Sequence, residues 1–161
     1  MFKELTNVPL VIAAHGTRDP EGVAVCRALA ERVQAKLPDT KLTMGFVELT
    51  EPSIPEAVAE ALEGLEPRGE TDAVVVPLML ATGGHVRIDI PEAIDEGRGA
   101  AKVAYSAALL GSPLLDSAVR NRVVEALGEW RPQDTACVLV GRGSPDRKST
   151  RLNSSHSTES R

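Results

Sequence analysis

The sequence predicts an α/β fold, a parallel sheet of about four to five strands flanked by helices. Two observations support this prediction. Short apolar runs alternate with stretches whose apolar residues recur at helical spacing, as expected for strand–helix alternation. The run from Ala73 to Leu80, AVVVPLML, is continuously apolar, which is typical of a strand covered on both faces. The 161 residues, 42% of them hydrophobic, suffice for about one domain with one core.

The strands are expected at five short apolar runs. Each run is bounded by turn or capping residues, and helical spacing fills the segments between the first four runs. The expected strands are residues 8–14, 42–49, 73–80, 103–109 and 136–140.

The helices between these strands are predicted from their first residues. Asp19 followed by Pro20 gives an N-cap and a proline at the first helical position, and Pro38 is expected to end that helix. Ser53 and Glu56 have the spacing of a capping box. A short helix is expected from Pro91 to about Glu96. The apolar helix positions are Val25, Leu29 and Val33, then Val58, Ala61 and Leu62, and finally Leu115, Val119, Val123, Leu127 and Trp130. Cys26 is expected in the core.

Residues 1–146 are expected to form the folded module, and residues 147–161 to lie outside it. That last segment, RKSTRLNSSHSTESR, holds one aliphatic residue and resembles a translated sequencing adapter. We therefore predict that it is an adapter-derived, disordered tail. A natural disordered tail is the alternative. Residues 136–146, with VLVGRGSPD, repeat the pattern of apolar strand and x-G-[ST] turn seen near the N-terminus, so a second module is expected to begin there.

Composition excludes several classes of protein. The formal net charge of −5 gives no overall basic surface for nucleic acid, and 2% aromatic residues cannot build stacking platforms for single strands. No apolar run approaches the roughly 18 residues of a membrane span, and the N-terminus does not have the pattern of a signal peptide. Two cysteines make neither a disulfide framework nor a CxxC metal site. We expect a reduced, cytoplasmic protein with no nucleic-acid or membrane partner.

Three candidate metal ligands follow the first three strands. His15 comes directly after the first, Glu48 lies at the end of the second, and His85 follows the third. Parallel sheets bind ligands at the carboxyl ends of their strands, so these side chains can converge if the strands are neighbours. Two imidazoles and a carboxylate suit a divalent metal such as cobalt, iron or nickel. Taken singly, each histidine also fits an ordinary polar loop residue, and Glu48 a solvated carboxylate.

Loop arginines and glycines suggest a ligand but do not identify it. Arg18, Arg87 and Arg98 lie in or near the same loops, where they could hold a polyanion or simply be solvated. Gly83 and Gly84 could cradle a phosphate. Because the sequence contains neither GxxxxGK[ST] nor GxGxxG, we expect no nucleotide.

Four segments in order, spanning about residues 8–146, resemble the sirohydrochlorin chelatase family (CbiX/SirB type, class II chelatases). They are LVIAAHGTRDPEG, GFVELTEPSIPEAV, VVVPLMLATGGHVRIDIPEAI and VLVGRGSPD. The resemblance implies a class II chelatase-like α/β module and a lyase that inserts a divalent metal into sirohydrochlorin without ATP. Cobalt, for cobalamin biosynthesis, is the expected metal; iron, for sirohaem, and nickel are the alternatives.

The resemblance also implies roles for individual residues. His15 would be a metal ligand and proton acceptor, His85 a second metal ligand, and Glu48 a catalytic and substrate-binding carboxylate. The tetrapyrrole would contact Leu80, Ala81, Thr82, Gly83 and Gly84. Its carboxylates would give Arg18 and Arg87 a purpose, and Met79, Leu80 and Val86 could supply an apolar wall.

The resemblance finally implies a partner. Long members of the family carry two modules in one chain, and short members form dimers, so a second module in cis or a homodimer is expected. This sequence resembles the N-terminal module of a long member. Two alternatives to a chelatase are a non-catalytic metal- or tetrapyrrole-binding half-module and a flavodoxin-like nucleotide binder, the latter disfavoured by the missing phosphate loop.

Overall fold

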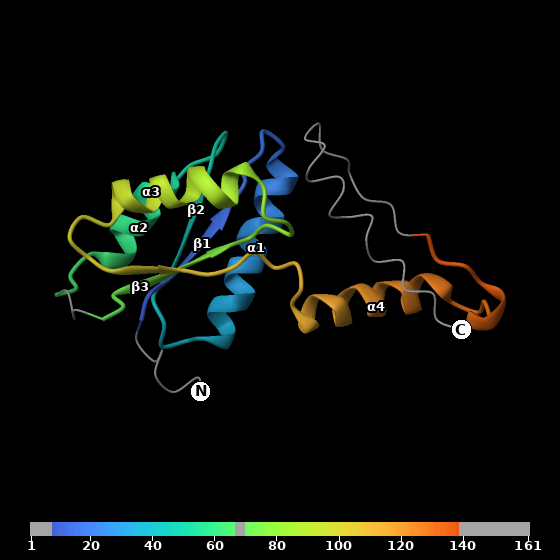
Figure 1. Ribbon diagram of the computed structural model, residues 1–161. Helices are drawn as coiled ribbons and strands as arrows, with labels where there is room; N and C mark the ends of the chain where they lie inside the picture. Colours follow the sequence, from blue (N-terminus) through green and yellow to red (C-terminus); the bar gives the residue numbers. More distant parts are fainter. Residues whose placement is uncertain (1–7, 67–69, 139–161) are drawn as a thin grey trace. The chain divides into compact units, whose positions relative to one another are not determined.

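The computed structural model describes residues 8–66 and 70–138. The chain divides into two compact units, the first ending at Leu110 and the second beginning at Gly111. The first unit carries the sheet and the second a single long helix (Figure 1). Each unit is described by itself.

The first unit contains four parallel strands in the order β2-β1-β3-β4. Ala14 pairs with Phe46 where β1 and β2 end, and Val75 pairs with Tyr105 where β3 meets β4. The strands are β1 (Leu10–Ala14), β2 (Leu42–Phe46), β3 (Ala73–Pro77) and β4 (Val103–Tyr105). This arrangement confirms the predicted fold class.

Helices cover both faces of this sheet. The chain steps from β1 outward to β2, then back across β1 to β3, and right-handed crossovers in opposite directions place their helices on opposite faces. Accordingly α1 lies on one face, and α2 and α3 lie together on the other (Figure 1). The helical segments are α1 (Pro20–Lys36), α2 (Ile54–Leu62), the π-helix η1 (His85–Asp89) and α3 (Ile90–Gly97).

The core lies between the sheet and the α2–α3 layer. Alternate residues of β1 and β3 point toward that layer because successive strand side chains face opposite ways. The buried core cluster comprises Val11, Ala13, Val75, Ile54, Ala57, Val58, Ala61, Ile90 and Ile94. At about 25 cal/mol for each Å² of apolar surface removed from water, this layer is the main stabilising contact of the first unit.

The helix starts predicted at Asp19 and Ser53 are confirmed, and the short helix expected from Pro91 to about Glu96 is α3, Ile90–Gly97. The Asp19 carboxylate accepts the backbone N–H of Glu21 at 3.0 Å, and α1 ends at Lys36, just before Pro38. Ser53 and Glu56 form a complete capping box at the start of α2. The backbone N–H and the hydroxyl of Ser53 each donate to the Glu56 carboxylate at 2.8 Å, and these bonds lower the pKa of Glu56.

The expected buried face of α1 is wrong. Val25 is 70% exposed and Leu29 is 38% exposed. The helix instead turns Ala30 to the sheet, with Cys26 and Val33 half-buried beside it. Of the three predicted positions, Val25 and Leu29 therefore face away from the sheet, and only Val33 is half-buried.

The strands are shorter than the apolar runs that predicted them. β2 ends at Phe46 rather than Leu49, and β3 at Pro77 rather than Leu80, because the chain turns into loops at the carboxyl edge. β4 ends at Tyr105 rather than Leu109. A fifth strand was expected at 136–140, but residues 136–138 form none, and residues 139–140 lie outside the described part. The described residues of the second unit offer no strand to pair with it.

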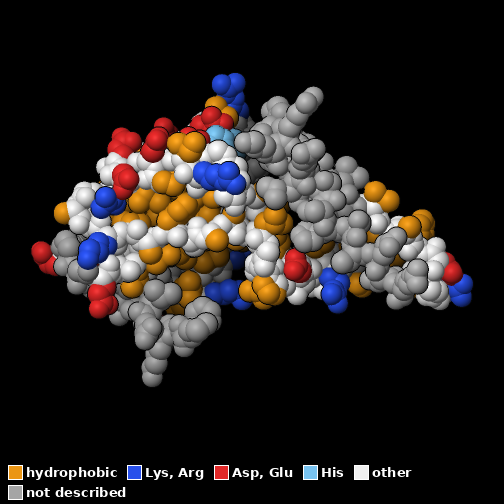
Figure 2. All heavy atoms as spheres, viewed as in Figure 1, with side chains coloured by type: hydrophobic (Ala, Val, Ile, Leu, Met, Phe, Trp, Pro, Cys, Tyr) orange, Lys and Arg blue, Asp and Glu red, His pale blue; other side chains and the backbone are white. Residues whose placement is uncertain are grey.

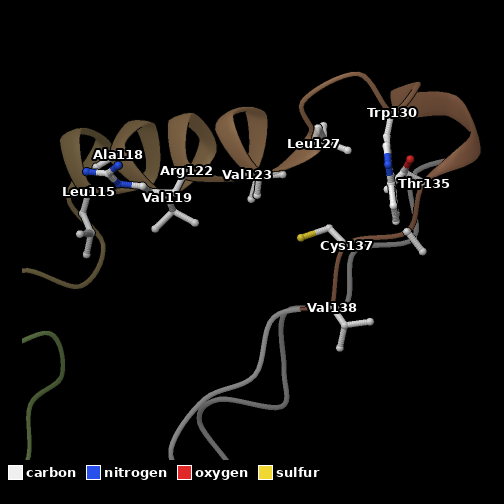
Figure 3. Close-up of a pocket in the computed structure, with 12 residues that line it drawn as sticks. Leu115, Ala118, Val119, Arg122, Val123, Leu127, Trp130, Thr135, Cys137 and Val138 are labelled. Atoms are coloured by element: carbon white, nitrogen blue, oxygen red, sulfur yellow. The ribbon is translucent and has the colours of Figure 1, made fainter.

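The second unit contains α4 (Pro113–Leu127) and a short 3₁₀ turn, η2 (Pro132–Asp134). The helix ends before Gly128, so Trp130 lies beyond it rather than on it. Within this unit the apolar side chains of α4 line an open groove of about 660 Å³ together with Trp130 and Cys137 (Figure 3). Among the described residues, neither histidines nor carboxylates line this groove.

Two further expectations concern the whole chain. In the described part, the helices are too short or too polar to cross a bilayer. The tail at 147–161, and most of the expected second-module start at 136–146, lie outside the described residues, so both stay predictions.

Candidate metal centre

The candidate site lies at the carboxyl edge of the sheet, where the strand order reverses. From β1 the chain leaves toward β2, and from β3 it leaves toward β4, on the opposite side. Such a reversal opens a crevice between neighbouring loops, which is the usual ligand site of open parallel sheets. His15 follows β1 directly, and His85 begins η1 after the β3 loop, so both histidines flank this crevice.

Backbone hydrogen bonds bring Glu48 beside His15. The parallel ladder continues past the strand ends, because the N–H of Val47 donates to Ala14 and that of Glu48 donates to His15, at 2.9 and 3.1 Å. Gly16 makes this approach possible. It has φ +92°, and a Cβ there would lie 1.7 Å from the Glu48 carbonyl oxygen. Only glycine fits such a position.

Two threonines tie the same loops together further out. The Thr17 N–H donates to Thr50 Oγ1 at 3.1 Å, and the Thr50 hydroxyl donates back to the Thr17 carbonyl at 2.9 Å. Between them and the site, Leu49 has φ +64°, which costs a non-glycine residue about 1–2 kcal/mol. The loop after β2 is therefore held in one shape by hydrogen bonds that offset local strain.

The structure brings His15, Glu48 and His85 into one cluster. One ligand atom from each lies within 4.8 Å of the others, and His15 Nδ1 lies 3.8 Å from Glu48 Oε1. The two imidazole rings meet edge to face, with centroids 4.6 Å apart. Ligands about 2.0–2.2 Å from one ion lie at most about 4.4 Å from each other. A side-chain shift of less than about an ångström would therefore bring all three onto one divalent ion.

The cluster is open to solvent. The side chains of His15 and Glu48 are 52% and 49% exposed, and that of His85 is 37% exposed. Histidine is visible at the molecular surface (Figure 2). Three protein ligands on an open rim leave coordination positions for a substrate, in contrast to a closed four-ligand structural site.

Comparison with known proteins identifies the family of the chain. A family model described as CbiX matches residues 9–126. The chain belongs to the CbiX family. Two curated relatives of the chain differ in length. It is 32% identical to the sirohydrochlorin cobaltochelatase of Methanopyrus kandleri, over 76% of this chain and 99% of that protein. It is 31% identical to the sirohydrochlorin ferrochelatase of Priestia megaterium, over 91% of this chain but only 54% of that protein.

Solved structures of CbiX relatives share the fold. A cobalamin biosynthesis CbiX protein from Marinobacter aquaeolei aligns with a TM-score of 0.61 and 29% identity, over 74% of this chain and 97% of that one. The sirohydrochlorin chelatase SirB from Bacillus subtilis subspecies spizizenii, solved in complex with cobalt, aligns with a TM-score of 0.64 and 26% identity. That alignment covers 74% of this chain and 50% of SirB.

The CbiX chain presents two of the three expected arginines near the cluster. Arg18 is exposed in the loop that carries His15, Arg87 is exposed on η1 two residues after His85, and neither forms an ion pair within the described ranges. Arg98 was expected in the same group, and this is wrong. It follows α3, pairs with Asp95 at 2.6 Å, and leads into the start of β4. Helix-to-strand loops lie at the amino edge of a parallel sheet, away from the cluster.

The loop before His85 is exposed, as a contact surface requires. Leu80 is 60% exposed, and residues 81–84, Ala81, Thr82, Gly83 and Gly84, are all exposed. A Cβ on Gly83 or Gly84 would meet no atom within 4 Å, so the packing described here does not demand glycine at either position. Of the three residues expected to form an apolar wall for the tetrapyrrole, only Leu80 is available at the surface. Val86 is buried, at 6% exposed, and Met79 packs against the core.

Sequence reasoning missed the residues that support the ligands. Asp89 contacts the His85 ring, Tyr105 contacts the turn that carries it, and Thr50 braces the loop of Glu48. Asp89 could have been found, since it lies four residues after a candidate ligand, a spacing that pairs side chains in helices. Tyr105 carries no such local signal, because it reaches the site from another strand.

Proposed function

We propose that this CbiX chain inserts a divalent metal into sirohydrochlorin without ATP, with cobalt as the metal. The observation that carries the proposal is the cluster of His15, Glu48 and His85 at the edge of the sheet. The names of the curated relatives support the substrate, and they include both cobaltochelatases and a ferrochelatase. The cobalt-bound SirB structure supports cobalt as a metal that this fold accepts. Iron is the alternative metal, since the same ligands accept both.

The three side chains suit transfer of a metal rather than its retention. Neutral imidazoles bind first-row divalent metals well, and a carboxylate adds charge that concentrates the cation. Because each side chain is partly exposed, the bound ion keeps open positions through which pyrrole nitrogens can replace water and protein ligands. Delivery then needs no large movement of the protein.

We propose that His15 and Glu48 also remove the pyrrole protons. Metal insertion releases two pyrrole protons, and imidazoles accept protons near neutral pH. The His15 ring has Nδ1 3.2 Å from the Gly16 carbonyl oxygen and 3.8 Å from Glu48. As the metal leaves His15 for the macrocycle, its imidazole becomes free to accept a proton, and Glu48 stabilises the resulting cation.

Sirohydrochlorin would lie across the exposed loops. Its carboxylates would pair with the Arg18 and Arg87 guanidinium groups, which are free of ion pairs within the described ranges. Leu80 and the segment from Ala81 to Gly84 would contact the flat macrocycle, since backbone without bulky side chains allows close approach.

The proposal includes a second CbiX module as partner, either in cis or as a second copy. The ferrochelatase relative is about twice as long as the aligned part, whereas the Methanopyrus cobaltochelatase is covered almost whole. Both lengths therefore occur among relatives. Exposed apolar side chains in the second unit, such as Leu114 and Trp130 at 82% and 73%, support an association.

The test is to mix the metal-free chain with sirohydrochlorin and Co²⁺ and to follow the macrocycle absorbance. A chelatase converts many equivalents per chain, faster than the reaction without protein. The rival function, a non-catalytic half-module, is motivated by the half-length match to the ferrochelatase. It gives one equivalent of binding and no turnover, and that result would overturn the proposal. Repeating the assay with Fe²⁺ ranks the two metals.

A further inference from the structure

Asp89 lies against a candidate ligand without belonging to the ligand cluster. Its Oδ2 is 2.5 Å from His85 Nδ1, whereas the ligand atoms that gather in the described residues come from His15, Glu48 and His85. Both partners are partly exposed, at 37% for His85 and 46% for Asp89. The contact therefore joins the metal centre to a carboxylate outside it.

This contact determines which nitrogen of His85 can bind metal. A carboxylate only accepts hydrogen bonds, so the nitrogen beside it must carry the proton. With the proton on Nδ1, the lone pair lies on Nε2, the other ring nitrogen. A carboxylate behind a metal-binding histidine fixes the tautomer and the ring orientation, and makes the imidazole a stronger ligand.

The π-helix aligns the pair. η1 starts at His85 and ends at Asp89, and the N–H of Ile90 donates to the His85 carbonyl five residues earlier. This spacing widens the turn relative to an α-helix. His85 and Asp89, four residues apart, lie on the same side of the turn. The Asp89 carboxylate lies beside the His85 ring, with its Oδ2 2.5 Å from Nδ1. Such turns are rare and occur frequently at functional sites.

Tyr105 stabilises this turn from β4. The Val86 carbonyl finds no usual helical donor, because the Ile90 N–H is used by His85 and Pro91, the next residue, has none. The Tyr105 hydroxyl donates to it at 3.0 Å. Burial raises the pKa of Tyr105 above its ordinary value of 10.0, so the phenol stays protonated as a donor.

We propose that Asp89 is a positioning residue of the metal centre. It holds the Nδ1 proton of His85 and thereby presents Nε2 to the ion, while Tyr105 fixes the turn that carries both residues. The proposal rests on the proposed function only in taking His85 as a metal ligand.

The first test is titration of the full chain with Co²⁺ alone. Asp89→Ala is expected to weaken cobalt binding by about 10–100-fold, the usual effect of losing such a partner. Asp89→Asn keeps an acceptor oxygen but loses the charge, so its loss is smaller. The matched control is Asp95→Ala in α3, which removes the same charge from a carboxylate paired with Arg98. This control is expected to bind like the parent chain.

The second test is the tautomer itself, from ¹⁵N–¹H correlation spectra of the His85 ring without metal. The parent chain and Asp95→Ala are expected to carry the proton on Nδ1. Asp89→Ala is expected to shift it toward Nε2, a change that loss of general stability would not produce. Asp89→Asn keeps the proposal testable if the alanine variant folds poorly.

Three outcomes decide the matter. Cobalt binding by Asp89→Ala as tight as by Asp95→Ala, or an unchanged tautomer, overturns the positioning role. Complete loss of cobalt in Asp89→Ala with retention in His85→Ala makes Asp89 the ligand, and also overturns it. Unaltered cobalt binding by both His15→Ala and His85→Ala contradicts the proposed metal centre instead, which separates the two failures.

Discussion

At the scale of single residues, His15 and His85 meet edge to face, with their ring planes 88° apart. This arrangement lets one nitrogen of each ring approach the same point without the rings overlapping. Both side chains are partly exposed, so neither is needed to fill the core. Their chemistry can therefore be removed with little effect on folding.

His15→Ala and His85→Ala are each expected to abolish metal insertion. In the proposed site, each variant loses one of three metal ligands, and His15→Ala also loses the proposed proton acceptor. The unfolding free energy should stay within about 0.5 kcal/mol of the parent, as for most surface substitutions. Initial insertion rates and thermal unfolding curves measure the two effects. Full activity in either variant would remove that histidine from the site.

Glu48→Gln is expected to lower the insertion rate more than the affinity for sirohydrochlorin. In the proposed mechanism the Glu48 carboxylate attracts the metal and stabilises a protonated His15, and both effects belong to the chemical step. Arg87→Ala is the contrasting variant, because the guanidinium that we propose to bind the substrate should affect affinity more than rate. Steady-state rates and sirohydrochlorin titrations compare them. If Glu48→Gln weakens binding and spares the rate, the two roles are assigned wrongly.

At the scale of elements, the loops after β1 and β2 are built around a close backbone approach. Gly16 has the positive φ that lets the Glu48 carbonyl pass where a Cβ would otherwise lie. This one position couples the shape of both loops to the distance between His15 and Glu48. A change that disturbs the packing of these loops is therefore expected to change the distance between His15 and Glu48 as well.

Gly16→Ala is expected to destabilise the chain by roughly 1–3 kcal/mol, the cost of a strained backbone position, and to reduce insertion activity. Gly83→Ala is the matched control. Gly83 has no positive φ, and its Cβ would meet no atom within 4 Å, so its unfolding midpoint should not change. Chemical denaturation measures both variants. Equal stability of Gly16→Ala and Gly83→Ala would show that the loops can adjust around Glu48.

Sequence patterns predicted where the strands and helices lie better than which face of a helix is buried. The first four apolar runs became the four strands, and the capping signals at Asp19 and Ser53 are local hydrogen bonds that a short segment determines by itself. The buried face of α1 was missed because it depends on how closely the helix approaches the sheet. Val25 and Leu29 have the right spacing, yet Ala30 takes the buried position.

The candidate site was predictable only in part, for a similar reason. His15, Glu48 and His85 follow strand ends, and parallel topology alone brings such positions together. Arg98 was misplaced although the end of α3 was predicted to within one residue, because a loop that leads from a helix into a strand emerges at the amino edge of a parallel sheet. The π-turn is stabilised by the hydrogen bond from the Tyr105 hydroxyl to the Val86 carbonyl, a contact across 19 residues that no local pattern contains.

At the scale of the whole molecule, the chain presents apolar surface in its second unit. The described residues of α4 include none that is buried, and Trp130 is 73% exposed. Solvent-exposed apolar patches of this kind promote association. A copy of the chain, or a second module in cis, would provide a cover by pairing equivalent surfaces.

Deletion of residues 147–161 is expected to leave thermal stability unchanged, because that segment has almost nothing apolar to bury. The shortened chain is expected to form a homodimer or to be poorly soluble. Light scattering at several concentrations measures its mass. A compact monomer at high concentration, with normal insertion turnover, would show that one module suffices.

The central claim is that His15, Glu48 and His85 together hold the metal that is delivered to the tetrapyrrole. X-ray absorption at the cobalt edge, on the full chain with one equivalent of Co²⁺, tests this most directly. The spectrum is expected to show scattering from two imidazoles, and His15→Ala and His85→Ala are each expected to remove one of them. Cobalt bound without imidazole, or an identical spectrum in both variants, would contradict the claim.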